Sequence, residues 1–118
     1  MVSIGILAST ICFSVGGIEE CHPILAGRNT PVGTFSMVRM STRKKGYGGD
    51  ILVFKETETV LFAIHRLYTL NPKQKRKQRL SSKTTKDNII TDGCVNVDPS
   101  VYNRLVECCS SEPLNIRK

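Results

Sequence analysis

The stretch Ile51-Leu52-Val53-Phe54-Lys55-Glu56-Thr57-Glu58-Thr59-Val60-Leu61-Phe62-Ala63-Ile64-His65 decides the fold class of this chain. Its two apolar runs, Ile51–Lys55 and Thr59–His65, are rich in β-branched and aromatic residues, and a short polar stretch separates them. This pattern predicts an antiparallel β-hairpin.

The residues before this hairpin predict further strands. We expect a buried strand in the apolar run Ile4–Val15, which ends at Gly16-Gly17, and then a loop as far as Gly27. A turn at Thr30-Pro31-Val32-Gly33 comes before a predicted strand over Thr34–Met40. Residues 41–50, which include three glycines, then form a hairpin-like connection.

The C-terminal part predicts one helix. Asp98 can cap its start, and Pro99 suits the first helical position. One face of this helix is apolar, at i, i+3, i+4 spacing: Val101, Tyr102, Leu105, Val106 and Cys109. We therefore predict that residues 1–118 form a single, mostly β domain in which one amphipathic helix covers a sheet.

Composition excludes some functions and points to others. No apolar run approaches the roughly 20 residues of a membrane-spanning helix. Trp is absent and Tyr and Phe are few, which disfavours an RNA-binding sheet with stacking aromatics. The 17 basic and 10 acidic residues give a net charge of +7, which favours a polyanionic partner such as nucleic acid, an anionic membrane or an acidic wall polymer.

The excess positive charge lies in one segment, Arg66–Lys86. It holds eight basic residues and no acid, so the rest of the chain is close to neutral. Its polar composition predicts a long surface loop with one helical turn around Pro72–Leu80. Such a loop is either functional or simply solvated.

The five cysteines leave two interpretations open. Either two disulfides join Cys12 and Cys21 to Cys108 and Cys109 and leave Cys94 free, or all five are reduced. With no CxxC pair and only two histidines, we expect no zinc site and no cofactor. Because no Lys or Arg precedes Arg28, the apolar N-terminal run lacks the basic start of a signal peptide.

His65 and Cys94 are the residues able to do covalent chemistry. His65 ends an apolar strand, and Cys94 follows Gly93 in a tight segment where substrate can approach the backbone. Residue types alone also fit a structural histidine and a buried thiol.

Three segments in order add a resemblance: Thr30-Pro31-Val32-Gly33-Thr34-Phe35, Ala63-Ile64-His65 and Thr91-Asp92-Gly93-Cys94-Val95-Asn96-Val97. Together they resemble the L,D-transpeptidase catalytic domain of the YkuD-like family, over nearly the whole chain. The stretch from Arg79 to Ile90 looks like a branch with a longer connection between histidine and cysteine.

The resemblance implies a role for each residue of the site. Cys94 is the implied nucleophile and His65 its base. Gly93 and Cys94 supply the oxyanion amides, and Asp92 and Asn96 support the site. The residues implied to bind substrate are Arg66, Thr91 and Arg79.

The resemblance also implies a β-sandwich and a reaction. A stem peptide of peptidoglycan loses its terminal D-alanine, and the rest becomes a thioester on Cys94. A second stem then resolves the thioester to give a 3→3 cross-link, or water does so in a carboxypeptidase reaction. Implied with it are inhibition by carbapenem-type β-lactams, a periplasmic or secreted location, no metal and no nucleic-acid partner.

The chain departs from the family pattern at three places. Many members have a histidine where Asp92 stands, and a carboxylate there raises a thiol pKa. Arg66 stands where small residues are common, and a cation acts in the opposite sense. Strands that usually precede the Thr30–Gly33 turn are expected to be lacking, which would leave an exposed sheet edge.

Two other functions remain open. One is a catalytically degenerate module that binds wall peptide, and the other is a polyanion-binding protein that uses the basic segment. In the enzyme hypothesis, the basic segment borders the mouth of the active site and meets anionic wall material or stem-peptide carboxylates.

Overall fold

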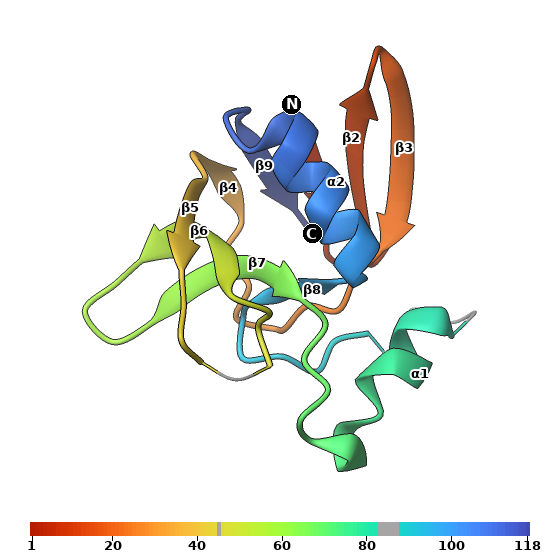
Figure 1. Ribbon diagram of the computed structural model, residues 1–118, viewed down its shortest axis with the longest axis vertical. Coiled ribbons are helices and arrows are strands. Elements are labelled where there is room, and N and C mark those ends of the chain that lie inside the picture. The colour runs from red at the N-terminus through yellow and green to blue at the C-terminus, as the bar shows by residue number, and fades with distance from the viewer. Residues whose placement is uncertain (45, 83–87) are drawn as a thin grey trace.

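A computed structural model describes residues 1–44, 46–82 and 88–118, and shows two β-sheets with one longer helix against them (Figure 1). The first sheet has the order β3-β2-β1-β9-β4, with β3 (Ile18–Pro23), β2 (Thr10–Val15), β1 (Val2–Gly5), β9 (Leu114–Arg117) and β4 (Gly33–Phe35). The second has the order β5-β6-β7-β8, with β5 (Val38–Ser41), β6 (Asp50–Glu56), β7 (Leu61–Arg66) and β8 (Val95–Val97). The mostly β prediction is confirmed.

The predicted hairpin is the centre of the second sheet. Strands β6 and β7 pair antiparallel, with Val53 opposite Ala63 and a bulge before Lys55. On its other side, β7 pairs in parallel with β8, and His65 lies opposite Asn96. A parallel pair needs a long crossover, and the basic segment is that crossover.

The N-terminal third differs from the prediction. The run expected to be one strand forms two, β1 and β2, and residues 18–23, expected in a loop, form strand β3. The turn at Gly16 and Gly17, where φ is +58° and +82°, folds β3 back onto β2. The sequence of β3 shows no apolar alternation because β3 is an edge strand whose residues are exposed or half-buried.

Two more strands differ from the prediction. The predicted strand over residues 34–40 is split into β4 and β5, which belong to different sheets. Strand β9, which was not predicted, lies between β1 and β4 and buries Leu114 and Ile116 in the core. Its apolar alternation covers too few residues to stand out in the sequence.

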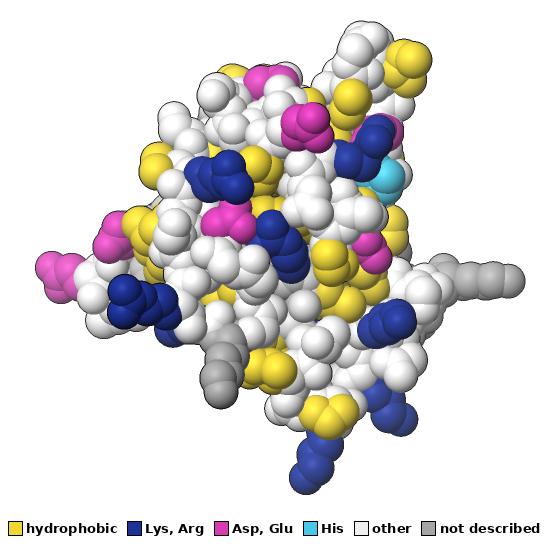
Figure 2. All heavy atoms as spheres, in the orientation of Figure 1, with side chains coloured by type: hydrophobic (Ala, Val, Ile, Leu, Met, Phe, Trp, Pro, Cys, Tyr) yellow, Lys and Arg dark blue, Asp and Glu magenta, His cyan; other side chains and the backbone are white. Residues whose placement is uncertain are grey.

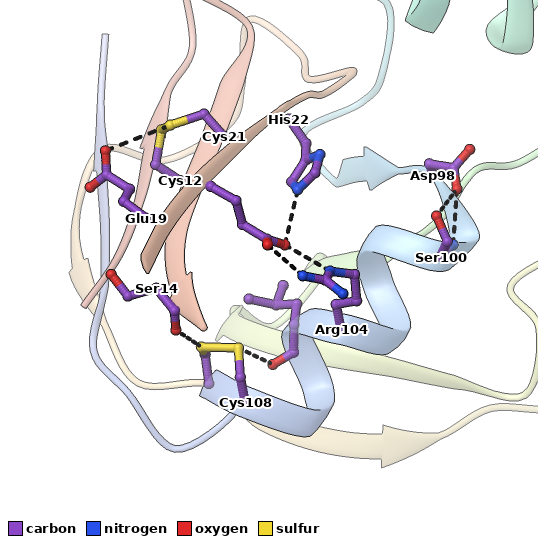
Figure 3. Close-up of polar contacts among 12 residues, drawn as sticks. Cys12, Ser14, Glu19, Cys21, His22, Asp98, Ser100, Arg104 and Cys108 are labelled. Atoms are coloured by element: carbon purple, nitrogen blue, oxygen red, sulfur yellow. Dashed lines mark hydrogen bonds and ion pairs between the residues drawn. A yellow bond between two sulfur atoms is a disulfide. The ribbon is translucent and has the colours of Figure 1, made fainter. Parts of the chain in front are cut away.

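The two sheets share one hydrophobic core, and α2 (Pro99–Cys109) closes it (Figure 1). The core side chains come from both sheets and from the helix; they include Ile4, Phe13, Leu52, Ile64, Val95, Leu105 and Ile116. The predicted start of the helix is confirmed, since the Asp98 carboxylate accepts from the Ser100 amide at 2.9 Å. Figure 3 shows this cap and the Arg104–Glu20 ion pair, which ties α2 to β3.

The cysteine pairing differs from the one that we considered. Cys12 pairs with Cys21, its direct neighbour across β2 and β3, and Cys108 pairs with Cys109 (Figure 3). Proximity explains this: the partners of the first pair face each other in the hairpin, and those of the second are consecutive. Cys94 is free, as in both interpretations.

The basic segment holds a short 3₁₀ turn, η1 (Pro72–Gln74), and α1 (Arg76–Ser81), where one helical turn was predicted. Figure 2 shows Lys and Arg side chains around α1, at the lower edge of that face. Lys83 and Lys86 lie outside the described residues. Within the described ranges, no helix is both long and apolar enough to cross a membrane.

Asp50 connects four elements around the end of the second sheet. Its carboxylate accepts from Arg66 Nη1 on β7 and from Arg39 Nε on β5, both at 2.7 Å, and from the Tyr102 hydroxyl on α2 at 3.0 Å. The Arg66 guanidinium also lies over the Tyr102 ring, 4.3 Å from its centroid. This network fixes α2 against β7.

We expect Asp50→Asn to lower the free energy of unfolding by about 2 kcal/mol, because it removes the charge that compensates the largely buried Arg66 guanidinium. Arg39→Ala, which removes the exposed partner, is the matched control and should change stability little. Urea denaturation of the two variants measures both values. Equal losses of stability in the two variants would mean that Asp50 stabilises the fold only through Arg39, which would contradict a role for its pair with Arg66.

Candidate active site

The pairing of β7 with β8 brings His65 and Cys94 to one cavity. His65 lies within β7, and Cys94 directly precedes β8, so the parallel register sets the two segments side by side. The cavity has a volume of about 130 Å³ and is lined by both residues together with Met40, Ser41, Thr42, Lys44, Tyr47, Ile51, Leu61 and Ala63. A larger hollow, of about 730 Å³, lies between α1 and the start of α2. Neither His65 nor Cys94 is among its lining residues.

His65 is buried and held in one tautomer. Its Nδ1 lies 2.7 Å from the Arg66 carbonyl oxygen, which can only accept, so Nδ1 carries the proton. Its Nε2 is then the acceptor and lies 3.4 Å from the Asn96 amide nitrogen. Burial lowers the pKa of His65 to about 4, so the ring is neutral at neutral pH.

Cys94 is half-buried at the wall of the same cavity. Its thiol donates to the Leu61 carbonyl at 3.5 Å. Burial raises the thiol pKa, and Asp92 adds to the rise, whereas Arg76 and Lys44 oppose it. Asp92 thus acts in the direction expected, but the opposing cations are Arg76 and Lys44, since Arg66 is paired with Asp50. At neutral pH the pair is a thiol beside a neutral imidazole.

Two threonines shape the turn that carries Cys94. The Thr91 hydroxyl donates to the Cys94 carbonyl at 2.6 Å and accepts from the Gly93 amide at 3.2 Å. The Thr30 hydroxyl donates to the Gly93 carbonyl at 3.0 Å and accepts from the Gly27 amide. Thr91 therefore holds the turn from within, and Thr30 holds it from the Thr30–Gly33 turn. The sequence predicted the turn that contains Thr30, but it indicated no role for Thr30 in the site.

Gly93 and Gly27 are required by close packing. At Gly93, where φ is +128°, a Cβ would lie 2.5 Å from the Phe62 ring. At Gly27 it would lie 2.1 Å from the Thr91 carbonyl oxygen. The Gly93 amide, expected to be an oxyanion donor, is engaged with Thr91 in this conformation.

Asn96 connects His65 to the basic segment. It is fully buried, and its side-chain oxygen accepts from Arg76 Nη1 at 2.7 Å and from the Tyr68 amide at 3.4 Å. With its oxygen so engaged, the Asn96 amide nitrogen faces His65 Nε2. Arg76 was not among the predicted site residues. In the sequence it is one of eight basic residues in a long polar segment, and nothing there distinguishes it from the other seven.

The two arginines predicted to bind substrate lie elsewhere. The Arg66 guanidinium belongs to the Asp50 network, and its backbone carbonyl is what reaches His65. Arg79 Nε donates to the Gln74 carbonyl, and Arg79 lines a separate hollow formed within the basic segment. The structure therefore brings His65, Cys94 and Asn96 together, with Thr91 and Gly93 in the adjoining turn and Asp92 exposed.

We expect Gly93→Ala to lower the free energy of unfolding by about 3 kcal/mol, since the methyl group meets the Phe62 ring and the backbone is strained. Gly49→Ala has a similar positive φ but open space around it, so it should cost about 1 kcal/mol. Phe62→Leu in the Gly93→Ala background should recover part of the loss. Chemical denaturation measures all three, and equal costs at the two glycines would refute the packing argument.

The depressed pKa of His65 makes stability depend on pH. Between pH 6.5 and about 4 the unfolded chain binds a proton at His65 that the folded protein does not. The free energy of unfolding therefore falls by about 3 kcal/mol as the pH drops through this window. His65→Gln should lack this part of the slope, and parallel stability curves for the two proteins would contradict a buried, neutral His65.

Solved structures of other proteins share this fold. The structure of Bdellovibrio bacteriovorus Bd1075 matches 98% of this chain with a TM-score of 0.61 and 15% identity. The crystal structure of an L,D-transpeptidase (Yku) from Stackebrandtia nassauensis matches 99% with a TM-score of 0.58 and 16% identity. The chain spans about half of each, 46% and 54%. No family model and no curated protein matches the sequence. At these identities the likeness concerns the fold, and it confirms the predicted YkuD-like β-sandwich.

Proposed function

We propose that this protein is a cysteine-dependent L,D-transpeptidase that acts on stem peptides of peptidoglycan. The observation that carries the proposal is one cavity that is lined by both a free, half-buried thiol and a buried histidine of defined tautomer. The fold shared with an L,D-transpeptidase supports it. This function implies a peptidoglycan substrate and a location outside the cytoplasm.

In the first half-reaction, Cys94 Sγ attacks the carbonyl carbon of the peptide bond before the terminal D-alanine. His65 Nε2 takes the thiol proton as the C–S bond forms, because the thiol is not ionised beforehand. The tetrahedral intermediate then expels the D-alanine amine, which takes the proton back from His65 as the C–N bond breaks. The product is a thioester on Cys94.

In the second half-reaction, the amine of another stem peptide attacks the thioester carbonyl. His65 accepts a proton from that amine and returns it to the departing Cys94 sulfur as the C–S bond breaks. The result is a 3→3 cross-link. When water takes the place of the amine, the same steps release a shortened peptide, and the enzyme acts as an L,D-carboxypeptidase.

Each neighbouring residue has a part in these steps. The Arg66 carbonyl binds the Nδ1 proton and so directs the lone pair of Nε2 into the site. For His65 to act as base, Nε2 must exchange its long contact with Asn96 for the thiol, and the thiol must leave the Leu61 carbonyl. The Cys94 amide is the first oxyanion donor, and that of Gly93 joins it when released by Thr91.

One observation favours a second candidate, a wall-peptide-binding module without turnover. Among the described residues, the Cys94 thiol donates its hydrogen bond to the Leu61 carbonyl and not to His65. Burial and Asp92 also keep the thiol protonated. Catalytic hydrogen bonds often tighten only when substrate binds, so this arrangement is also compatible with the enzyme.

Incubation with a carbapenem separates the two candidates. We expect the intact mass to rise by that of one carbapenem, with the adduct on Cys94, because the strained β-lactam carbonyl is open to the same attack. Cys94→Ala should show no adduct, and His65→Gln should acylate at least about 100-fold more slowly while remaining folded. A folded wild-type protein that keeps its thiol unmodified would instead favour the binding module.

A further inference from the structure

A second hollow adjoins the catalytic cavity. It has a volume of about 420 Å³ and is lined by Lys44, Tyr47, Tyr68, Leu70 and Arg76. Lys44 and Tyr47 also line the cavity of Cys94, so the two spaces share a wall. The Tyr47 ring lies close to two other rings, with centroid distances of 4.3 Å to His65 and 5.9 Å to Tyr68. The second hollow therefore borders the cavity of Cys94 at Lys44 and Tyr47.

This hollow is cationic. Two of its five lining residues are basic, and neither it nor the catalytic cavity has an acidic residue among its described lining residues. Lys44 and Arg76 both lower the pKa of Cys94, so their field reaches the reacting sulfur. An anionic group of a ligand in this hollow meets both cations.

Arg76 differs from three other arginines of the structure, each of which forms an ion pair. Arg66 and Arg39 pair with Asp50, and Arg104 pairs with Glu20. Within the described ranges, the half-buried Arg76 forms no ion pair, and Asp92 acts on it only through space. A partly desolvated guanidinium forms strong, charge-assisted hydrogen bonds with a carboxylate.

Arg76 is also held rigidly. Its Nε donates to Gln74 Oε1 at 2.8 Å, its Nη1 donates to Asn96 Oδ1 at 2.7 Å, and its guanidinium lies 5.1 Å from the centre of the Tyr68 ring. These contacts use two of the five N–H donors and leave Nη2 for a ligand. Little side-chain entropy is then lost when an anion binds.

We propose that Arg76 and Lys44 form a carboxylate subsite of the acyl donor, next to Cys94 and between Tyr47 and Tyr68. The inference rests on the proposed function and assigns the two residues that bind the carboxylate of the donor's terminal D-amino acid. That residue leaves as an amine, and its carboxylate stays on the leaving-group side of the scissile bond. A donor ending in an amide lacks the charge that this subsite binds.

Alkylation of Cys94 tests the subsite without any enzymatic turnover. Iodoacetate and iodoacetamide are nearly the same size, and with both the sulfur displaces iodide, but only iodoacetate carries a carboxylate. We expect the ratio of the iodoacetate rate constant to the iodoacetamide rate constant to fall about tenfold in Arg76→Gln. In Lys44→Gln, where the cation is exposed, it should fall about two- to threefold.

The design separates charge from other effects of the variants. Arg76→Gln also breaks the contact to Asn96, but a change in thiol reactivity alters both rate constants and cancels in the ratio. Lys44→Gln leaves Asn96 and His65 untouched. Lys118→Gln, which removes an exposed cation next to the first sheet, is the control and should leave the ratio unchanged. Ratios that are equal in all four proteins overturn the subsite.

The second arm uses the substrate class itself. A stem tetrapeptide ending in D-alanine should be cleaved about tenfold faster than the same peptide ending in D-alaninamide, and Arg76→Gln should abolish this preference. Equal cleavage of both peptides by the wild type, together with an unchanged alkylation ratio, overturns the subsite while the proposed function stands. Cleavage of neither peptide overturns the proposed function, and the alkylation ratio then decides the anion site alone.

Discussion

The parallel pairing of β7 with β8 is the constraint on which the site depends. It sets His65 opposite Asn96 and places Cys94 one residue ahead of β8, at the same cavity wall. Parallel neighbours cannot be joined by a tight turn, so the chain must leave the sheet and return between residues 66 and 95. The basic segment makes this crossover, so the topology brings it close to the cavity of His65 and Cys94.

The electrostatics of the site follow from burial more than from charge. Burial lowers the pKa of His65 and raises that of Cys94, so the two residues meet as neutral groups. In the proposed reaction, proton transfer then accompanies attack on the carbonyl. Two cations near the site, Lys44 and Arg76, line a neighbouring hollow, where the proposed substrate would meet them. The positive charge of the chain thus includes one cation, Arg76, that is built into the site through Asn96.

Sequence reasoning located the fold class, the hairpin and the C-terminal helix, because these have strong local signals. The β6–β7 hairpin has two β-rich runs, and the start of α2 has both a capping aspartate and a proline. Strands β3 and β9 lack such signals: the first is an edge strand without an apolar face, and the second is four residues long. Both depend on neighbours that are distant along the chain or joined by a glycine turn.

The residues of the candidate site also divide into those with a local sequence signal and those without one. His65, Cys94, Gly93 and Asn96 belong to recognisable segments, so the sequence indicated them. The Arg66 carbonyl, the Thr30 hydroxyl and the Arg76 guanidinium act through tertiary contacts, and no spacing in the sequence reveals them. Arg66 shows the difference well: the residue was predicted for its charge, which Asp50 neutralises, and it reaches the site through its backbone.

The intact mass of the protein after brief incubation with a stem tetrapeptide ending in D-alanine tests the central claim most directly. We expect the mass to rise by that of the tetrapeptide less D-alanine, with the adduct on Cys94, removed by hydroxylamine and absent from Cys94→Ala. D-alanine release without a covalent adduct, or an adduct on any residue other than Cys94, would contradict it.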